Sequence, residues 1–184
     1  MGPRNLAVRA YMVRPLHPPP GRVRAPAGCT LQPFDRACLG QLASVQHAAY
    51  AGTVDVRVFP ELLATVGLCR AHLESLLHHR QPLEFSTRAS LMLMEDGVAR
   101  GFIMAATGPL NTASVDNLAV EPDRRGGAGR ALLLECLRRL HALGARSVSL
   151  TVTCANVSAL QLYRQAGFME CVRLPIRAGA TDPP

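Results

Sequence analysis

A glycine-rich corner near the middle of the chain is the first feature with chemical meaning. Residues 115–133 (VDNLAVEPDRRGGAGRALL) join an apolar run, a short arginine-glycine segment and a second apolar run with helical spacing. Gly126, Gly127 and Gly129 let the backbone approach a ligand closely, and the first N–H groups of a helix beginning there lack partners within the helix. Such a corner is suited to bind an anion.

Two common phosphate-binding patterns do not fit this corner. A P-loop ends in Gly-Lys-Ser/Thr, and the chain contains no lysine. A dinucleotide-binding fingerprint needs a small residue where Leu132 stands and an acidic residue about 20 positions further on, which the region around Val152 lacks. The pattern that remains is Arg124-x-x-Gly127-x-Gly129 at a strand-to-helix corner.

A second motif follows one helix and one strand later, at residues 156–168 (NVSALQLYRQAGF). Together with the glycine corner and the LAVEP segment (118–122) that leads into it, this motif resembles the GNAT superfamily of acetyl-coenzyme A-dependent N-acetyltransferases. The resemblance extends over about residues 29–168 in the order of the elements. It is specific in the second half, where two motifs stand at the right distance on the right elements.

The resemblance implies a coenzyme A site at the glycine corner. In the family this loop wraps the pyrophosphate, which the helix N-terminus and the arginine charges explain physically. The preceding strand pairs with the pantetheine arm, and strand 147–153 splays away to admit the thioester. The loop at 122–127 looks one residue shorter than in many members. The residues expected to contact the cofactor are Leu118, Ala119, Val120, Arg124, Arg125, Gly126, Gly127, Ala128, Gly129, Arg130, Asn156 and Ala159.

Acetyl transfer to an amine needs a neutral nucleophile, a donor for the developing oxyanion and a proton for the departing thiolate. Tyr163 matches the tyrosine that commonly gives this proton in the family, and a phenol with an ordinary pKa of about 10 is protonated at neutral pH. The alternative is that Tyr163 only packs its helix against the sheet. A backbone N–H between Leu118 and Val120 is the expected oxyanion donor.

Two carboxylates are candidates for contact with the acceptor amine. Asp116 lies two residues before Leu118, so strand alternation places both side chains on one face, where the family's general base often lies. Tyr50 and Asp55 flank the turn that overhangs the acceptor pocket in the family, where Asp55 would meet a substrate ammonium. The alternative for both carboxylates is a solvated position on the surface. If a chain of water molecules removes the proton, or if the acceptor binds already deprotonated, no side chain acts as the general base.

Hydrophobic spacing predicts the elements that must position these residues. Strands are expected at 29–34, 90–94, 98–105, 112–120, 147–153 and 168–176, with an Asp-Gly hairpin at 96–97. Helices are expected at 35–50, 59–83, about 130–143 and 156–166, with a turn at 51–55. The fold class is therefore α/β (α+β, GNAT-like), with a mixed, mostly antiparallel sheet, splayed central strands and about four flanking helices.

The first 27 residues differ from the rest in being rich in proline and arginine, which favours an extended segment. We expect residues 1–27 to form an N-terminal segment and residues 28–184 a single GNAT domain. The family places two paired strands after the second-motif helix, but only 168–176 has a strand pattern here. Residues 6–13 are expected to supply the missing strand, from the same chain or from a partner in a homodimer, because an unpaired sheet edge is a liability.

Composition narrows the class of protein and its partners. The net charge is +7, but the 20 basic residues are scattered arginines and aromatics make up 4%, which does not favour nucleic acid. The six cysteines lack metal-ligand spacing, so no metal is expected, and as free thiols they suit a reducing cytosol. No stretch reaches the about 18 apolar residues that span a bilayer, and arginines interrupt any signal-like run near the start. We therefore expect a cytoplasmic protein without a membrane partner.

The function expected from these features is transfer of an acetyl group from acetyl-CoA to a primary amine, by direct attack in a ternary complex. One alternative is a non-catalytic acyl-CoA-binding or regulatory module that keeps the cofactor corner, and another is a basic nucleic-acid adaptor. The acceptor stays open among a small amine, an amino acid, an antibiotic and a protein N-terminus, because a fold does not determine its substrate.

Overall fold

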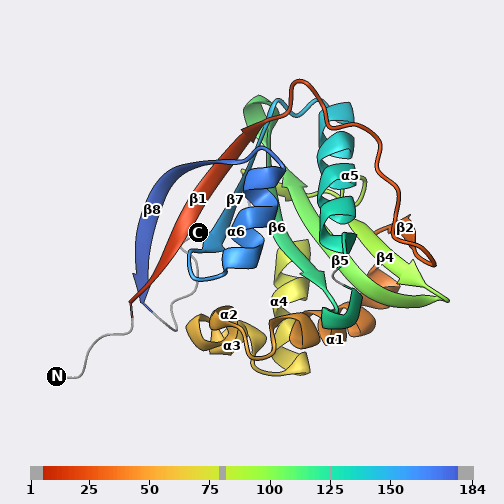
Figure 1. Cartoon of the computed structure of the whole chain (residues 1–184), viewed down its shortest axis with the longest axis vertical. Helices are drawn as coiled ribbons and strands as arrows, with labels where there is room; N and C mark the ends of the chain where they lie inside the picture. Colours follow the sequence, from red (N-terminus) through yellow and green to blue (C-terminus); the bar gives the residue numbers. More distant parts are fainter. Residues whose placement is uncertain (1–5, 79–81, 125, 178–184) are drawn as a thin grey trace.

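The computed structural model describes residues 6–78, 82–124 and 126–177, which form one sheet with helices on both faces (Figure 1). The strands follow the order β2-β4-β5-β6-β7-β1-β8, and β3 pairs with β5. All strand pairs are antiparallel except β6 and β7, so the predicted mixed, mostly antiparallel sheet is confirmed. The strands are β1 (Leu6–Pro15), β2 (Thr30–Pro33), β3 (Glu84–Phe85), β4 (Leu91–Glu95), β5 (Val98–Thr107), β6 (Thr112–Val120), β7 (Ser147–Thr153) and β8 (Met169–Arg177).

The described residues form six α-helices rather than about four. The single helix expected at 59–83 is divided, because the hydroxyl of Thr65 accepts the backbone N–H of Leu68 at 3.2 Å and starts a new helix. Leucine spacing continues across this break, so hydrophobic periodicity does not detect it. The expected turn at 51–55 is also shorter, because a helix already begins at Val54. The helices are α1 (Leu39–Tyr50), α2 (Val54–Val58), α3 (Pro60–Leu63), α4 (Val66–Leu77), α5 (Ala128–Ala142) and α6 (Val157–Gln165).

Buried side chains form two cores, one on each face of the sheet. Leu132, Leu137 and Leu160 bring α5 and α6 onto one face, and Leu42 and Leu73 bring α1 and α4 onto the other (Figure 1). Each fully buried leucine stabilises the fold by about 1.5–3 kcal/mol relative to an exposed one. The two packed layers hold the sheet between them and fix the helix ends that surround the site.

The N-terminal strand β1 lies inside the sheet between β7 and β8. It pairs with β7 from Arg9 opposite Thr153 to Pro15 opposite Ser147, and with β8 over almost its whole length. The strand expected at 6–13 is therefore present and is supplied by the chain itself. It is an interior strand, and β8 is the one that ends the sheet.

Strands β6 and β7 separate soon after they meet. Their pairing is limited to Thr112–Ser114 opposite Ser147–Ser149, so the second half of β6 has no partner on that side among the described strands. A bulge in β6 accompanies the separation, since Asn117 and Val115 lie opposite the consecutive residues Met104 and Ala105. The predicted splay of the central strands is confirmed, and it opens a gap beside residues 116–120.

The described ranges contain neither a membrane-spanning helix nor a cluster of metal-ligating side chains. Within those ranges, no helix has the length and apolar character needed to cross a membrane. The same ranges contain no group of three or more histidine, cysteine, aspartate or glutamate side chains arranged to hold a metal ion.

Candidate active site

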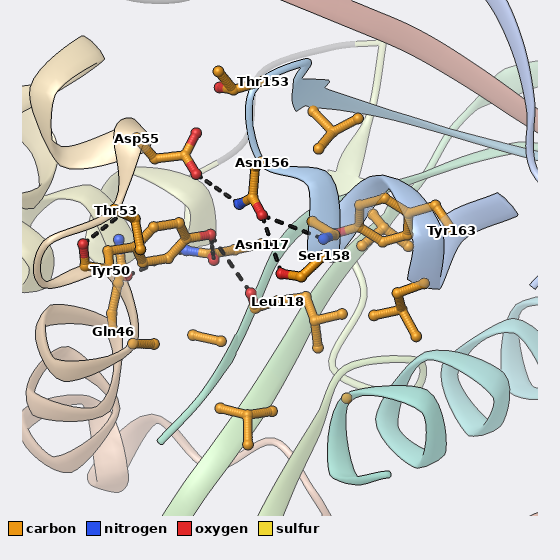
Figure 2. A pocket seen from close by; sticks show the side chains of 18 of the residues that line it. Gln46, Tyr50, Thr53, Asp55, Asn117, Leu118, Thr153, Asn156, Ser158 and Tyr163 are labelled. Atoms are coloured by element: carbon orange, nitrogen blue, oxygen red, sulfur yellow. Dashed lines mark hydrogen bonds between the residues drawn. The ribbon is translucent and has the colours of Figure 1, made fainter. Parts of the chain in front are cut away.

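A cavity of about 520 Å³ opens where β6 and β7 diverge. Figure 2 shows Tyr50 and Asp55 on one side and Asn156 and Tyr163 on the other, with β6 between them. The cavity brings together most of the residues that the sequence singled out, although they come from five separate elements and the loops beside them. Those that line it are Tyr50, Asp55, Asp116, Leu118, Ala119, Val120, Gly127, Gly129, Arg130, Asn156, Ala159 and Tyr163.

Three of the described residues expected to contact the cofactor are not part of the cavity wall. Arg124 lies outside it, and its guanidinium pairs with Glu95, with 2.8 Å between Nη2 and Oε2. Gly126 and Ala128 also lie outside it, and Ala128 is fully buried at the start of α5. Arg125 falls outside the described residues. The corner therefore reaches the cavity through Gly127, Gly129 and Arg130.

The backbone at Gly127 requires a glycine. Its φ is +87°, a left-handed conformation that side chains with a Cβ adopt only with strain, and a Cβ built there would point into open space. Gly127 immediately precedes α5, whose first turn contains no acidic residue. The corner therefore presents the positive end of a helix and an unobstructed backbone, together with the guanidinium-bearing residue Arg130.

Asn156 links the two sides of the cavity. Its Oδ1 accepts the backbone N–H of Ala159 at 3.2 Å and so caps α6, which explains why the helix begins there. Its Nδ2 donates to Oδ2 of Asp55 at 2.7 Å, across the cavity from α6 to α2 (Figure 2). One amide side chain therefore fixes a helix start and a buried carboxylate that is only 7% exposed.

A buried chain of polar groups holds Tyr50. The hydroxyl of Tyr50 donates to Oδ1 of Asn117 at 3.4 Å, and Nδ2 of Asn117 donates to Oε1 of Gln46 at 3.2 Å. Because the Gln46 oxygen accepts from Asn117, its Nε2 is the donor to Nδ1 of His72, at 2.9 Å. The donors thus run in one direction from Tyr50 to His72, and the Tyr50 hydroxyl also lies within donating distance, 3.5 Å, of the backbone carbonyl oxygen of Leu118.

Burial keeps both tyrosines protonated. Burial, followed by the negative charge of Asp55, raises the pKa of Tyr163 to about 12, and the positive charge of Arg9 acts in the opposite direction. Burial, followed by the charge of Asp55, raises the pKa of Tyr50 well above its usual range. Tyr163 also packs edge-on against Phe168, with 5.8 Å between the ring centroids. The Tyr163 side chain therefore both packs against Phe168 and lines the cavity.

The bulge in β6 lies at Asp116, the residue expected to share a face of the strand with Leu118. The side chain of Val115 belongs to the core beneath α5, whereas Asn117 bonds to Gln46 on α1, so regular alternation is interrupted between them. Asp116 still lines the cavity, and its Oδ1 accepts the hydroxyl of Ser114 at 2.5 Å.

Several cavity residues were not singled out from the sequence. Gln46 could have been noticed, because it is a fully buried polar residue on the apolar face of α1. Arg9 had no such signal, because it reaches the cavity only through the insertion of β1 between β7 and β8. The hydroxyl of Thr153 is buried in the cavity wall and has no hydrogen-bond partner among the described residues. Asn117 and His72 are further polar residues of the cavity wall that the sequence did not single out.

Comparison with known proteins agrees with the fold. The acetyltransferase (GNAT) family model matches residues 59–168, well over half of the chain, and the chain therefore belongs to that family. A segment of 62 residues is 40% identical to the [ribosomal protein bS18]-alanine N-acetyltransferase of Escherichia coli. This match spans 33% of the chain and 42% of that relative, less than half its length.

Solved structures share the fold at low sequence identity. The GCN5-related N-acetyltransferase of Sphaerobacter thermophilus is 22% identical with a TM-score of 0.64, and the match covers 95% of this chain and 53% of that one. The structure of the Escherichia coli ribosomal-protein-S18-alanine N-acetyltransferase is 21% identical with a TM-score of 0.59, covering 84% of this chain and 98% of that one. At these identities the likeness concerns the fold alone.

Proposed function

We propose that this chain is an N-acetyltransferase that moves an acetyl group from acetyl-CoA to a primary amine, by direct attack in a ternary complex. The GNAT family uses acetyl-CoA as its co-substrate. The observation that carries the proposal is the single cavity at the splay, which has the glycine corner at one end and Tyr50 with Asp55 at the other. A donor and an acceptor bound at these two ends would meet beside Tyr163, and such proximity is a large part of catalysis.

The cavity wall fits the donor chemically. The pyrophosphate would lie against Gly127, Gly129 and Arg130. The backbone of Leu118, Ala119 and Val120 has no strand partner on the side of the splay and would pair with the pantetheine arm, close to Asn156 and Ala159. The buried hydroxyl of Thr153 offers a further polar contact, because it has no partner among the described residues.

Tyr163 is the proposed proton donor to the departing thiolate. Its phenol is buried in the cavity wall and its raised pKa of about 12 keeps it protonated at every pH at which the enzyme would work. The phenol, with a pKa of about 12, is a weaker acid than a model thiol, whose pKa is about 8.5. Transfer of its proton to the thiolate is therefore unfavourable unless the phenolate regains a proton. The proton lost by the acetylated nitrogen supplies it, which keeps the step balanced.

Asp116 and Asp55 have separate proposed roles at the acceptor end. Asp55 would attract the acceptor's ammonium, since its buried carboxylate lines the cavity beside Tyr50. Asp116 is the candidate base that takes the first proton, from the acceptor's ammonium before attack, whereas the proton lost by the nitrogen after attack returns to the phenol of Tyr163. An Asp116→Asn variant with an unchanged pH–rate profile would assign that step to solvent.

Thiol release from acetyl-CoA in the presence of an amine panel tests the proposal. The panel should include small amines, amino acids and peptides, because the E. coli relative is named for alanine of a ribosomal protein, which supports a polypeptide among the acceptors. Mass spectrometry should find a product heavier by one acetyl group. Tight acetyl-CoA binding without turnover of any acceptor would instead support a non-catalytic acyl-CoA-binding or regulatory module.

A further inference from the structure

The N-terminal strand brings a positive charge to the acceptor end of the cavity. Arg9 stands in the middle of β1, opposite Thr153 on β7 and Leu174 on β8, and its side chain lines the cavity together with Asp55. No motif places an arginine there, because the position exists only through the pairing of β1 between two strands from the other end of the chain.

Two contacts from separate elements help to hold the guanidinium of Arg9. Its Nη2 donates to the backbone carbonyl of Thr151 at 3.2 Å. Its central carbon lies 5.1 Å from the centroid of the Phe59 ring, within the range of a cation–π interaction. One contact comes from β7 and the other from the junction between α2 and α3, so the charge is fixed at the wall rather than left on a mobile side chain.

Arg9 and Asp55 carry opposite charges, and both line the cavity. Both act on the phenols of Tyr50 and Tyr163, with opposite effects on the pKa of each. The carboxylate of Asp55 suits the ammonium of an acceptor, while a guanidinium presents a planar fork that matches a carboxylate. An acceptor with an amine and a nearby carboxylate complements both charges at once.

We propose that Arg9 is a specificity-determining residue that binds a carboxylate of the acceptor, so that the enzyme prefers amines with a carboxylate close to the reacting nitrogen. This inference rests on the proposed function. The carboxylate can belong to a free amino acid or to an acidic side chain at the start of a peptide, and the chemistry recognised by Arg9 is the same in both.

Two matched acceptor pairs test the proposal. One pair is alanine and alaninamide, and the other is a hexapeptide that begins with aspartate and its counterpart that begins with asparagine. We expect kcat/KM of the wild-type enzyme to be about tenfold to a hundredfold higher for the carboxylate member of at least one pair, the range of one charged hydrogen bond. The pair that shows the preference identifies the source of the carboxylate.

Variants assign the preference to Arg9. Arg9→Gln should abolish it by lowering kcat/KM for the carboxylate acceptor while leaving the neutral one nearly unchanged, and Arg9→Lys should retain part of it. Arg173→Gln is the matched control, because Arg173 is an exposed arginine on the neighbouring β8, paired with Glu170, and does not line the cavity. It should keep the wild-type ratio.

Other results would overturn the inference. A wild-type enzyme that acetylates both members of each pair equally has no carboxylate preference. An equal loss on both members in Arg9→Gln means that Arg9 only supports the strand. Acetylation of neutral amines in either case would leave the proposed function intact, whereas failure to acetylate any amine would remove the proposed function and the inference with it.

Discussion

The two ends of the cavity are built in different ways. The cofactor end comes mainly from one continuous stretch, the end of β6, the glycine corner and the first turn of α5, and offers mostly backbone groups. The proposed acceptor end is assembled from side chains of β1, α1, α2, α4 and β6, several of which are joined by hydrogen bonds between residues up to 71 positions apart. Ligand binding at the end built from backbone groups depends on the conformation of the chain. Ligand binding at the end built from side chains depends on each of their hydrogen-bond partners.

Gly127→Val should produce the largest effect, because it attacks the conformation on which the cofactor end depends. Valine at a φ of +87° is strained by about 1–2 kcal/mol and places a branched side chain in the corner. We expect coenzyme A affinity to fall by at least about a hundredfold in calorimetric titration, since both the backbone N–H groups and the helix start are displaced.

The matched control for this substitution is Gly21→Val, because Gly21 has an ordinary φ and open space around it and lies outside the corner. It should bind coenzyme A as the wild type does. Normal binding by Gly127→Val, with an unchanged melting temperature, would refute the pyrophosphate site.

Tyr163→Phe should separate chemistry from binding. Removing the phenol should lower kcat by about a hundredfold, the lower end of the range for a general acid, while coenzyme A affinity stays nearly constant. Because the raised pKa of Tyr163 is about 12, its deprotonation cannot cause any loss of activity below about pH 10. The pH–rate profiles of the variant and the wild type should therefore have the same shape between pH 6 and 9, measured by thiol release. A kcat equal to that of the wild type would leave Tyr163 with only its packing role.

Gln46→Leu should damage the acceptor end and spare the cofactor end. The substitution leaves Asn117 and His72 without their shared partner, which costs about 1–3 kcal/mol of folding free energy, and it releases the orientation of Tyr50. We expect KM for the acceptor to rise several-fold with coenzyme A affinity unchanged. Ser44→Ala, an exposed change on the same helix, is the control. An equal loss of affinity for both ligands would mean that the two ends are not independent.

Asn156 variants give the smallest expected effect and test the contact between the ends. Asn156→Ala removes both the α6 cap and the bond to Asp55, and it should cost about 1 kcal/mol or slightly more. Asn156→Asp keeps a good cap but places a second carboxylate against Asp55. Repulsion raises the pKa of the carboxylate pair, so this variant should lose stability as the pH rises through that pKa and recover it in acid. Thermal melts at pH 5 and pH 8 measure the difference, and a deficit that does not depend on pH would argue against the repulsion.

The sequence alone determined the features that depend on contiguous residues. The glycine corner, the Asn156–Tyr163 motif and the Asp-Gly hairpin could be predicted because local backbone conformation selects the residue types that form them. Asp96 and Gly97 indeed both have positive φ values. The GNAT resemblance followed from two such local motifs in the correct order, and from it the splay of β6 and β7.

Only the tertiary structure decided which distant side chains meet. A single bulge in β6 makes Asn117 rather than Asp116 the partner of Tyr50, because one extra residue changes the face that each later side chain occupies. The insertion of β1 between β7 and β8 carries Arg9 into the cavity, and it depends on pairing between opposite ends of the chain. The proposed cofactor end could therefore be predicted from the sequence. Prediction of the proposed acceptor end would also have required the strand register and the packing of the helices.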